Sequence, residues 1–277
     1  MRSVLPLVAL AAVGCSSQVG PAEEVTPTTA AAVIVVSRST GPGDAARIRD
    51  EATNDSSLAR SSIVARFVRV RQGAPLDEAA LRLAGVANDL PSPGTCRASA
   101  DEKSALQGRE IDLLDVGPMS VDGTILLPRQ MPDPTGIVSG VFYSARAAEP
   151  FTPATRIQVR ASGGQALPEG FVVNVATPKD LGDVRVASSA SGLDVSWDAT
   201  DDATDTVYMD VLDRASRVVT RCGSFDAGRF VVPSESLASA DEGQVVIHRV
   251  HTEAFTAKGI APGQVRFDLA RVVTFRR

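Results

Sequence analysis

Four aspartates lie close together between two patterns that are typical of β-strands. Asp198, Asp201, Asp202 and Asp205 fall within eight residues, and the residues between them are alanine and threonine. Calcium binds six to eight oxygen ligands in flexible geometry, so a loop of this composition is a candidate calcium site. The stretch lacks the glycine and the final glutamate of an EF-hand loop. The simpler alternative is a solvated acidic loop, in which aspartate and threonine form turns.

The chain has two histidines, His248 and His251, in a segment rich in valine and isoleucine. Such residues favour a strand, and side chains three positions apart on a strand point to opposite faces. The two imidazoles are therefore not expected to share a metal ion, although the same spacing on a helix could chelate one. We interpret them as two unrelated structural or surface histidines.

The sequence contains none of the common catalytic motifs. It has no Gly-x-Ser-x-Gly, no His-Glu-x-x-His and no Gly-x-x-x-x-Gly-Lys-Ser/Thr segment. The pair Gly163 and Gly164 lacks the rest of a nucleotide-binding pattern and predicts a hairpin turn. These features predict a protein without enzymatic activity. The alternative is a hydrolase that uses two carboxylates from distant strands, which no short motif would reveal.

Cys96 and Cys222 form an even pair once Cys15, at the end of the N-terminal apolar segment, is set apart. In an exported protein such a pair predicts a disulfide. It would close a loop of about 126 residues, to which the chain-entropy model assigns roughly 4–5 kcal/mol. The alternative is two separate buried thiols, which pack as small apolar side chains.

Apolar and polar residues alternate repeatedly along the chain after residue 60. A period of two appears at residues 156–161, 171–175, 193–197, 207–211 and 265–269, with turn signals between these runs. Many short strands predict an all-β fold, specifically an antiparallel β-sandwich, because no long amphipathic helix intervenes to link parallel strands. Only residues 76–84 predict a short helix.

Composition divides the chain into four segments. Residues 1–14 are an apolar leader, 15–60 a flexible tether, 61–178 a β-rich domain and 179–277 a second domain, with one larger domain as the alternative. The tether is small, polar and interrupted by prolines. Its exception is the run at residues 32–36, whose β-branched side chains predict an added edge strand.

Trp197 closes one predicted strand, Tyr208 lies in the next, and Cys222 follows. In these features residues 179–277 resemble fibronectin type III and immunoglobulin-like domains. Together with the β-rich residues 61–178, this predicts a chain with two immunoglobulin-like sandwiches. The resemblance implies that Trp197 packs across the sandwich. Leu193 and Val195 share its face of the strand, which independently predicts a buried tryptophan.

At the N-terminus Arg2 precedes an uncharged run over residues 4–13, which is too short to cross a bilayer as a helix. The following Ala-Val-Gly-Cys at residues 12–15 resembles the lipobox of bacterial lipoproteins. That resemblance implies a signal peptide over residues 1–14 and acyl chains on Cys15 that anchor the protein to a membrane. Ser16 after the cysteine implies the outer membrane. The alternative is an ordinary secretory signal.

Removing the leader takes away Arg2 and leaves 27 basic residues against 33 acidic ones, a net charge of −6. This mild acidity argues against a nucleic-acid partner and against attachment to anionic lipid through basic residues. The mature chain resembles uncharacterised bacterial envelope lipoproteins. We therefore predict a lipid-anchored cell-envelope protein with a non-enzymatic binding or structural role.

The predicted partners are the membrane, through Cys15, and another envelope protein. No cofactor is expected, apart from calcium at the acidic loop. Two alternatives use other chemistry. One is a surface-anchored hydrolase with paired carboxylates, and the other is a lipoprotein that binds a small ligand. The second lacks the alternating strand–helix units typical of such receptors.

Overall fold

The computed structural model describes residues 30–40, 61–71, 77–85, 90–98, 110–131, 137–146, 149–200, 202, 205–237 and 241–277. The predicted signal peptide, Cys15 and residues 41–60 of the expected tether lie outside the described residues. The described chain contains sixteen strands and one short α-helix, so the all-β prediction is confirmed. No helix in these ranges is long and apolar enough to cross a membrane.

The strands in the first half are β1 (Ala30–Thr40), β2 (Ser61–Val70), β3 (Cys96–Ala98), β4 (Ile111–Leu113), β5 (Met119–Val121), β6 (Thr124–Met131), β7 (Val138–Arg146), β8 (Arg156–Ala161) and β9 (Phe171–Ala176). Those in the second half are β10 (Arg185–Ser189), β11 (Gly192–Ser196), β12 (Thr206–Leu212), β13 (Val218–Phe225), β14 (Arg229–Pro233), β15 (Glu242–Ala257) and β16 (Ile260–Arg276).

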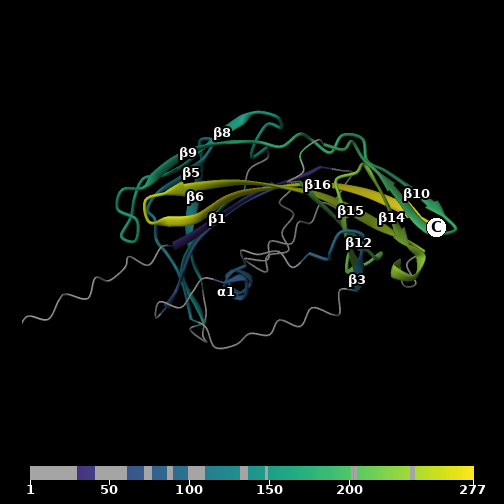
Figure 1. The fold of residues 1–277 in the computed structure, drawn as a ribbon, viewed down its shortest axis with the longest axis horizontal. Helices are drawn as coiled ribbons and strands as arrows, with labels where there is room; N and C mark the ends of the chain where they lie inside the picture. Colours follow the sequence, from purple (N-terminus) through teal and green to yellow (C-terminus); the bar gives the residue numbers. More distant parts are fainter. Residues whose placement is uncertain are drawn as a thin grey trace, which may run out of the picture.

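Thirteen strands form one large sheet in the order β3-β13-β12-β15-β16-β1-β2-β4-β7-β6-β5-β8-β9, and β10-β11-β14 form a second, small sheet. The large sheet is long and curved, with β1, β15 and β16 running along its length (Figure 1). The prediction of a purely antiparallel fold is wrong, because β1 pairs with β16, and β4 with β7, in parallel. Most of the chain separates β1 from β16, so no hairpin turn dictates their relative direction.

β1 is an interior strand, which corrects the expectation of a tether with an added edge strand at residues 32–36. It lies between β2 and β16, and side chains on both of its faces are buried. An uninterrupted apolar run such as AAAVIVV is typical of a strand that is covered on both sides. The lack of alternation in this run therefore indicated central burial.

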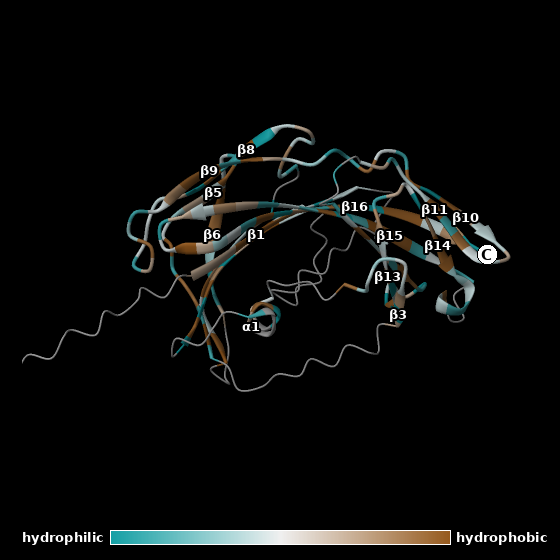
Figure 2. Cartoon of the chain, in the orientation of Figure 1, coloured by the Kyte–Doolittle hydropathy of each residue, from teal (hydrophilic) through white to brown (hydrophobic). Residues whose placement is uncertain are grey.

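One hydrophobic core joins strands from both sides of the boundary expected near residue 178. In the first lobe (β5, β6, β8 and β9 facing β1, β2 and β15), Phe171 of β9 stacks on Phe255 of β15 with ring centroids 5.4 Å apart. In the second lobe (β10 to β14 with the remaining parts of β15 and β16), the small sheet β10-β11-β14 supplies Leu193, Val195 and Val232 to the same core. Hydrophobic stretches recur along β16, which serves both lobes (Figure 2). The boundary thus does not separate two sheets.

The opposite face of the sheet carries a smaller hydrophobic cluster beneath the helix. Helix α1 (Glu78–Leu83) lies within the predicted residues 76–84. Asp77 caps it, since its side chain accepts a hydrogen bond from the Ala80 amide at 3.0 Å. Ala80 and Ala84 are buried in a cluster with Val33 and Val68.

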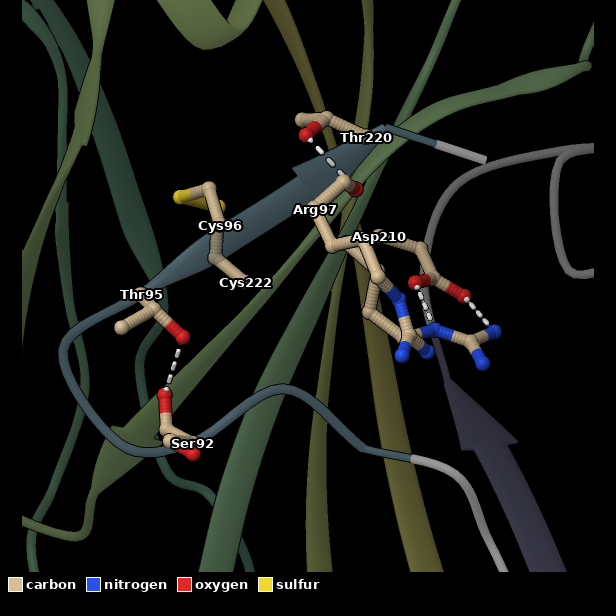
Figure 3. The surroundings of a disulfide bond; sticks show 8 residues. Ser92, Thr95, Cys96, Arg97, Asp210, Thr220 and Cys222 are labelled. Carbon is tan, nitrogen blue, oxygen red and sulfur yellow. Dashed lines mark hydrogen bonds and ion pairs between the residues drawn. A yellow bond between two sulfur atoms is a disulfide. The ribbon is translucent and has the colours of Figure 1, made fainter. Parts of the chain in front are cut away.

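Cys96 and Cys222 form a disulfide, as predicted, and the alternative of two free thiols is wrong. The two cysteines are direct partners across β3 and β13 (Figure 3). Around the disulfide, Thr220 Oγ1 donates to the carbonyl of Arg97 at 3.1 Å. β3 has three residues and pairs only with β13 among the described strands, so the disulfide reinforces a short ladder of hydrogen bonds.

Candidate functional site

Three parts of the second lobe bring charged residues together. They are the segment that joins β11 to β12, the turn between β13 and β14, and the middle of β15. Side chains alternate along a strand, so Arg249, His251 and Glu253 lie on the same face of β15 as the core residues Val245 and Ile247. This alternation directs a cationic residue into the space between the two sheets.

Arg249 is the organising residue of the site, and its side chain is completely buried. Its Nε donates to Asp226 Oδ2 at 2.8 Å, and its Nη2 to Asp226 Oδ1 at 3.2 Å. Its Nη1 donates to the carbonyl of Asp180 at 2.8 Å, while Nη2 also donates to the carbonyl of Asp198. One guanidinium thus joins β15 to three separate loops.

Trp197 is buried, as predicted, and its indole has a polar partner within the same network. Its Nε1 donates to Asp226 Oδ1 at 2.5 Å. Thr200 Oγ1 lies 3.0 Å from Asp226 Oδ2 and 2.8 Å from Asp205 Oδ2. The buried carboxylate of Asp226 is therefore hydrogen-bonded from several sides, which is the condition for placing a charge in a protein interior.

His251 lies between carboxylates on both of its ring nitrogens. Its Nδ1 is 2.6 Å from Asp205 Oδ1 and 3.7 Å from Asp202 Oδ2, and its Nε2 is 3.3 Å from Glu253 Oε1. The hydrogen bond to Asp205 raises the pKa of His251 above 6.5, and although burial opposes this rise, Glu253 adds to it. Asp205 is buried, whereas the side chain of Asp202 is half-exposed.

The structure brings together only part of the predicted acidic calcium site. The carboxylates of Asp202 and Asp205 approach the imidazole of His251, with all three possible ligand atoms within 4.8 Å of one another. Asp198 is not in this group; its carboxylate lies against Gly182, and its carbonyl binds Arg249. Asp201 lies outside the described residues.

His248 lies on the opposite face of β15, which confirms that the two histidines do not share a site. Its Nδ1 is 2.9 Å from Asp268 Oδ1, and its ring stacks on Tyr208 with centroids 4.2 Å apart. Arg221 covers the Tyr208 ring at 5.3 Å and forms an ion pair with Asp210 at 2.7 Å. Both histidines are thus buried and paired with carboxylates.

Two opposing influences determine the pKa of His248. Burial, the largest, lowers the pKa, and the nearby Arg221 lowers it further. The charge of Asp268, its hydrogen bond and the charge of Asp210 outweigh them and raise the pKa above the ordinary 6.5. Arg266 is another cation near Asp268, and burial lowers the pKa of that guanidinium.

We expect the stability of the protein to fall as the pH rises through the pKa of His248. A pKa that is raised in the folded state contributes stability fully below the unfolded value, and this contribution is lost above the folded value. The free energy of unfolding, measured by urea denaturation from about pH 5.5 to about pH 8.5, should therefore decline more in the wild type than in His248→Gln. His251 contributes equally to both proteins. Identical pH dependences would contradict the prediction.

Arg249 and Asp226, which organise the site, were not predicted from the sequence. The alternation along the predicted strand could have identified Arg249, because it places Arg249 on the same core-facing side as Val245 and Ile247. An inward-facing cation must have buried partners. Nothing local to Asp226, in a turn some twenty residues away, identifies it as that partner.

No protein-family model matches this chain, and no curated protein matches it in sequence. One imidazole nitrogen and two carboxylates converge at one point, beside a buried arginine–aspartate pair that holds the surrounding loops. Such an arrangement can hold a cation or a proton between loop and strand.

Proposed function

We propose that this chain is a lipid-anchored protein of the bacterial cell envelope, in the outer membrane, and that it acts by binding another envelope protein. The observation that carries the proposal is the disulfide between Cys96 and Cys222. Disulfides persist in oxidising compartments outside the cytosol, and the N-terminal signal pattern ending at Cys15 implies the same destination.

A binding role is supported by an exposed apolar surface on the first lobe. Ile125, Leu127 and Val172 have exposed fractions of 72%, 55% and 54%, and we call these three residues the outer patch. Strand register places Ile125 and Val172 in one row across the sheet, with Ser120 and Arg160 between them. Exposed apolar residues grouped in this way are typical of protein-interaction sites.

The edge of the large sheet lies beside this patch. β9 is the last strand in the sheet order, so one side of its backbone has no strand neighbour among the described residues. Such an edge can pair with a strand of another protein. We further propose that the second lobe works as an immunoglobulin-like sandwich module, an analogy of architecture that supplies a rigid support but no specific partner.

The proposal is tested by cross-linking in membranes of a bacterial host that expresses the full chain. We expect a specific adduct with one envelope protein, and we expect Ile125→Ser/Leu127→Ser to lose it because polar side chains remove the apolar contact area. Phe225→Ser is the matched control. Phe225 is equally exposed, at 72%, but lies on β13 in the second lobe.

The anchor is tested in the same membranes with Cys15→Ala. When Cys15→Ala is combined with the outer-patch substitutions, the chain should move to the soluble fraction, because the acyl chains and the protein partner are the two attachments proposed. Retention of this combined variant in the membrane would contradict the lipid anchor. An adduct that persists in the outer-patch variant, or that disappears equally in Phe225→Ser, would contradict the binding surface.

A further inference from the structure

We propose that Asp202, Asp205 and His251 form a binding site for a divalent transition metal of the zinc class. The site joins the loop between β11 and β12 to the middle of β15, and its three ligand atoms lie within 4.8 Å of one another. This inference is independent of the proposed function, since it concerns the opposite lobe from the outer patch.

The donor set selects the class of metal. Calcium and magnesium prefer ligand sets made entirely of oxygen, whereas imidazole with carboxylates suits zinc and its neighbours in the transition series. His251 Nδ1 faces both Asp205 and Asp202. Three protein ligands leave a fourth position for water, as in open zinc sites. The expected ion is therefore different from the calcium that the four aspartates alone suggest.

A second layer of contacts orients the ligands. Metal-binding histidines commonly donate their other ring N–H to a carboxylate, which fixes the ring and its tautomer. Glu253 Oε1 is 3.3 Å from Nε2 of His251, so it occupies that position. Thr200 Oγ1 donates to Asp205 Oδ2 at 2.8 Å and leaves Oδ1 facing the imidazole. The ligating atoms are thus held from behind.

The charges around the site leave room for a cation. Asp205 and Asp226 both have buried side chains, and Arg249 is the guanidinium between them. Arg249 Nε is 2.8 Å from Asp226 Oδ2 but 3.9 Å from Asp205 Oδ2, so Asp226 takes most of its charge. The carboxylate of Asp205 therefore faces His251 rather than Arg249. A divalent ion would add positive charge at the place where the ligands converge.

Binding requires only a small movement. The distance of 2.6 Å between His251 Nδ1 and Asp205 Oδ1 suits a hydrogen bond. Ligands on a tetrahedral zinc ion are separated by about 3.3 Å, because each lies about 2.0 Å from the metal. The side chain of Asp202 is half-exposed, so an ion can reach it from solvent. The two ligand atoms therefore need to move apart by less than about 1 Å, which rotation of the side chains allows.

The test is isothermal titration calorimetry of the full chain with zinc chloride, after treatment with a chelator, together with thermal melts. We expect saturable binding of one zinc ion and a higher melting temperature, with no comparable response to calcium. Asp202→Asn should abolish measurable zinc binding while leaving the apo protein folded, since the Asp202 side chain is half-exposed. Glu253→Gln should weaken binding by roughly 10–100-fold, the usual effect of removing such a supporting group.

Asp183→Asn is the matched control, since Asp183 is an exposed carboxylate of the same lobe that pairs with Arg185. It should bind zinc as the wild type does. His251→Gln tests the nitrogen ligand, and a folded melting profile of this variant without zinc binding supports the site. Absence of zinc binding in the wild type, equal binding in Asp202→Asn, or a preference for calcium would each overturn the assignment.

Discussion

Replacement of Arg249 by methionine is expected to lower the free energy of unfolding by about 3–5 kcal/mol, the cost of leaving a buried ion unpaired. Methionine has nearly the length of arginine, so the loss comes from charge and hydrogen bonding. The carboxylate of Asp226 would lose its guanidinium partner, and the carbonyls of Asp180 and Asp198 would lose their donors. The total free energy of unfolding of native proteins is about 5–15 kcal/mol, so urea denaturation should show the change clearly.

Two further variants separate the ion pair from the loop contacts. Arg249→Met/Asp226→Leu removes both charges and should recover part of the loss, because the unpaired carboxylate is then gone. Arg249→Lys keeps the charge but cannot satisfy the three loops at once, since an ammonium lacks the planar fork of a guanidinium. An Arg249→Met protein that unfolds within about 1 kcal/mol of the wild type would mean that the network contributes little.

Removal of the disulfide is expected to lower the free energy of unfolding by roughly 4–5 kcal/mol, the value that the chain-entropy model gives for this loop. The bond closes a loop of 126 residues, so its loss greatly enlarges the unfolded ensemble. Cys96→Ala/Cys222→Ala is the suitable variant, because Cys222 is completely buried and a serine hydroxyl there would have no water. Urea denaturation of this variant and of the wild type gives the difference.

The reductant dithiothreitol provides the control for the disulfide experiment. It should lower the unfolding midpoint of the wild type and leave that of the double alanine variant unchanged. Hydrogen exchange in β3 should rise most, since this three-residue strand has one paired neighbour among the described strands. If the oxidised wild type and the variant had the same free energy of unfolding, the prediction would be wrong. Residual structure in the denatured chain would then offset the effect of the disulfide.

The strands could be located from sequence because alternation is a local property. Each residue of a strand faces the side opposite to its neighbour, so a short window containing Leu193, Val195 and Trp197 is enough to assign both strand and core face. The same rule correctly placed His248 and His251 on opposite faces. The disulfide could be predicted because only two cysteines remained to pair.

The sequence by itself thus determined an all-β chain, its core-facing residues and its one internal cross-link. The tertiary structure decided the parallel pairing of β1 with β16 and the meeting of Asp205 and Asp226 with β15. These contacts join residues separated by 20 to more than 200 positions, and no local pattern encodes which distant segments will meet. For Asp205 and Asp226 the physical reason is burial, because the buried guanidinium of Arg249 is stable only where carboxylates from other loops reach it.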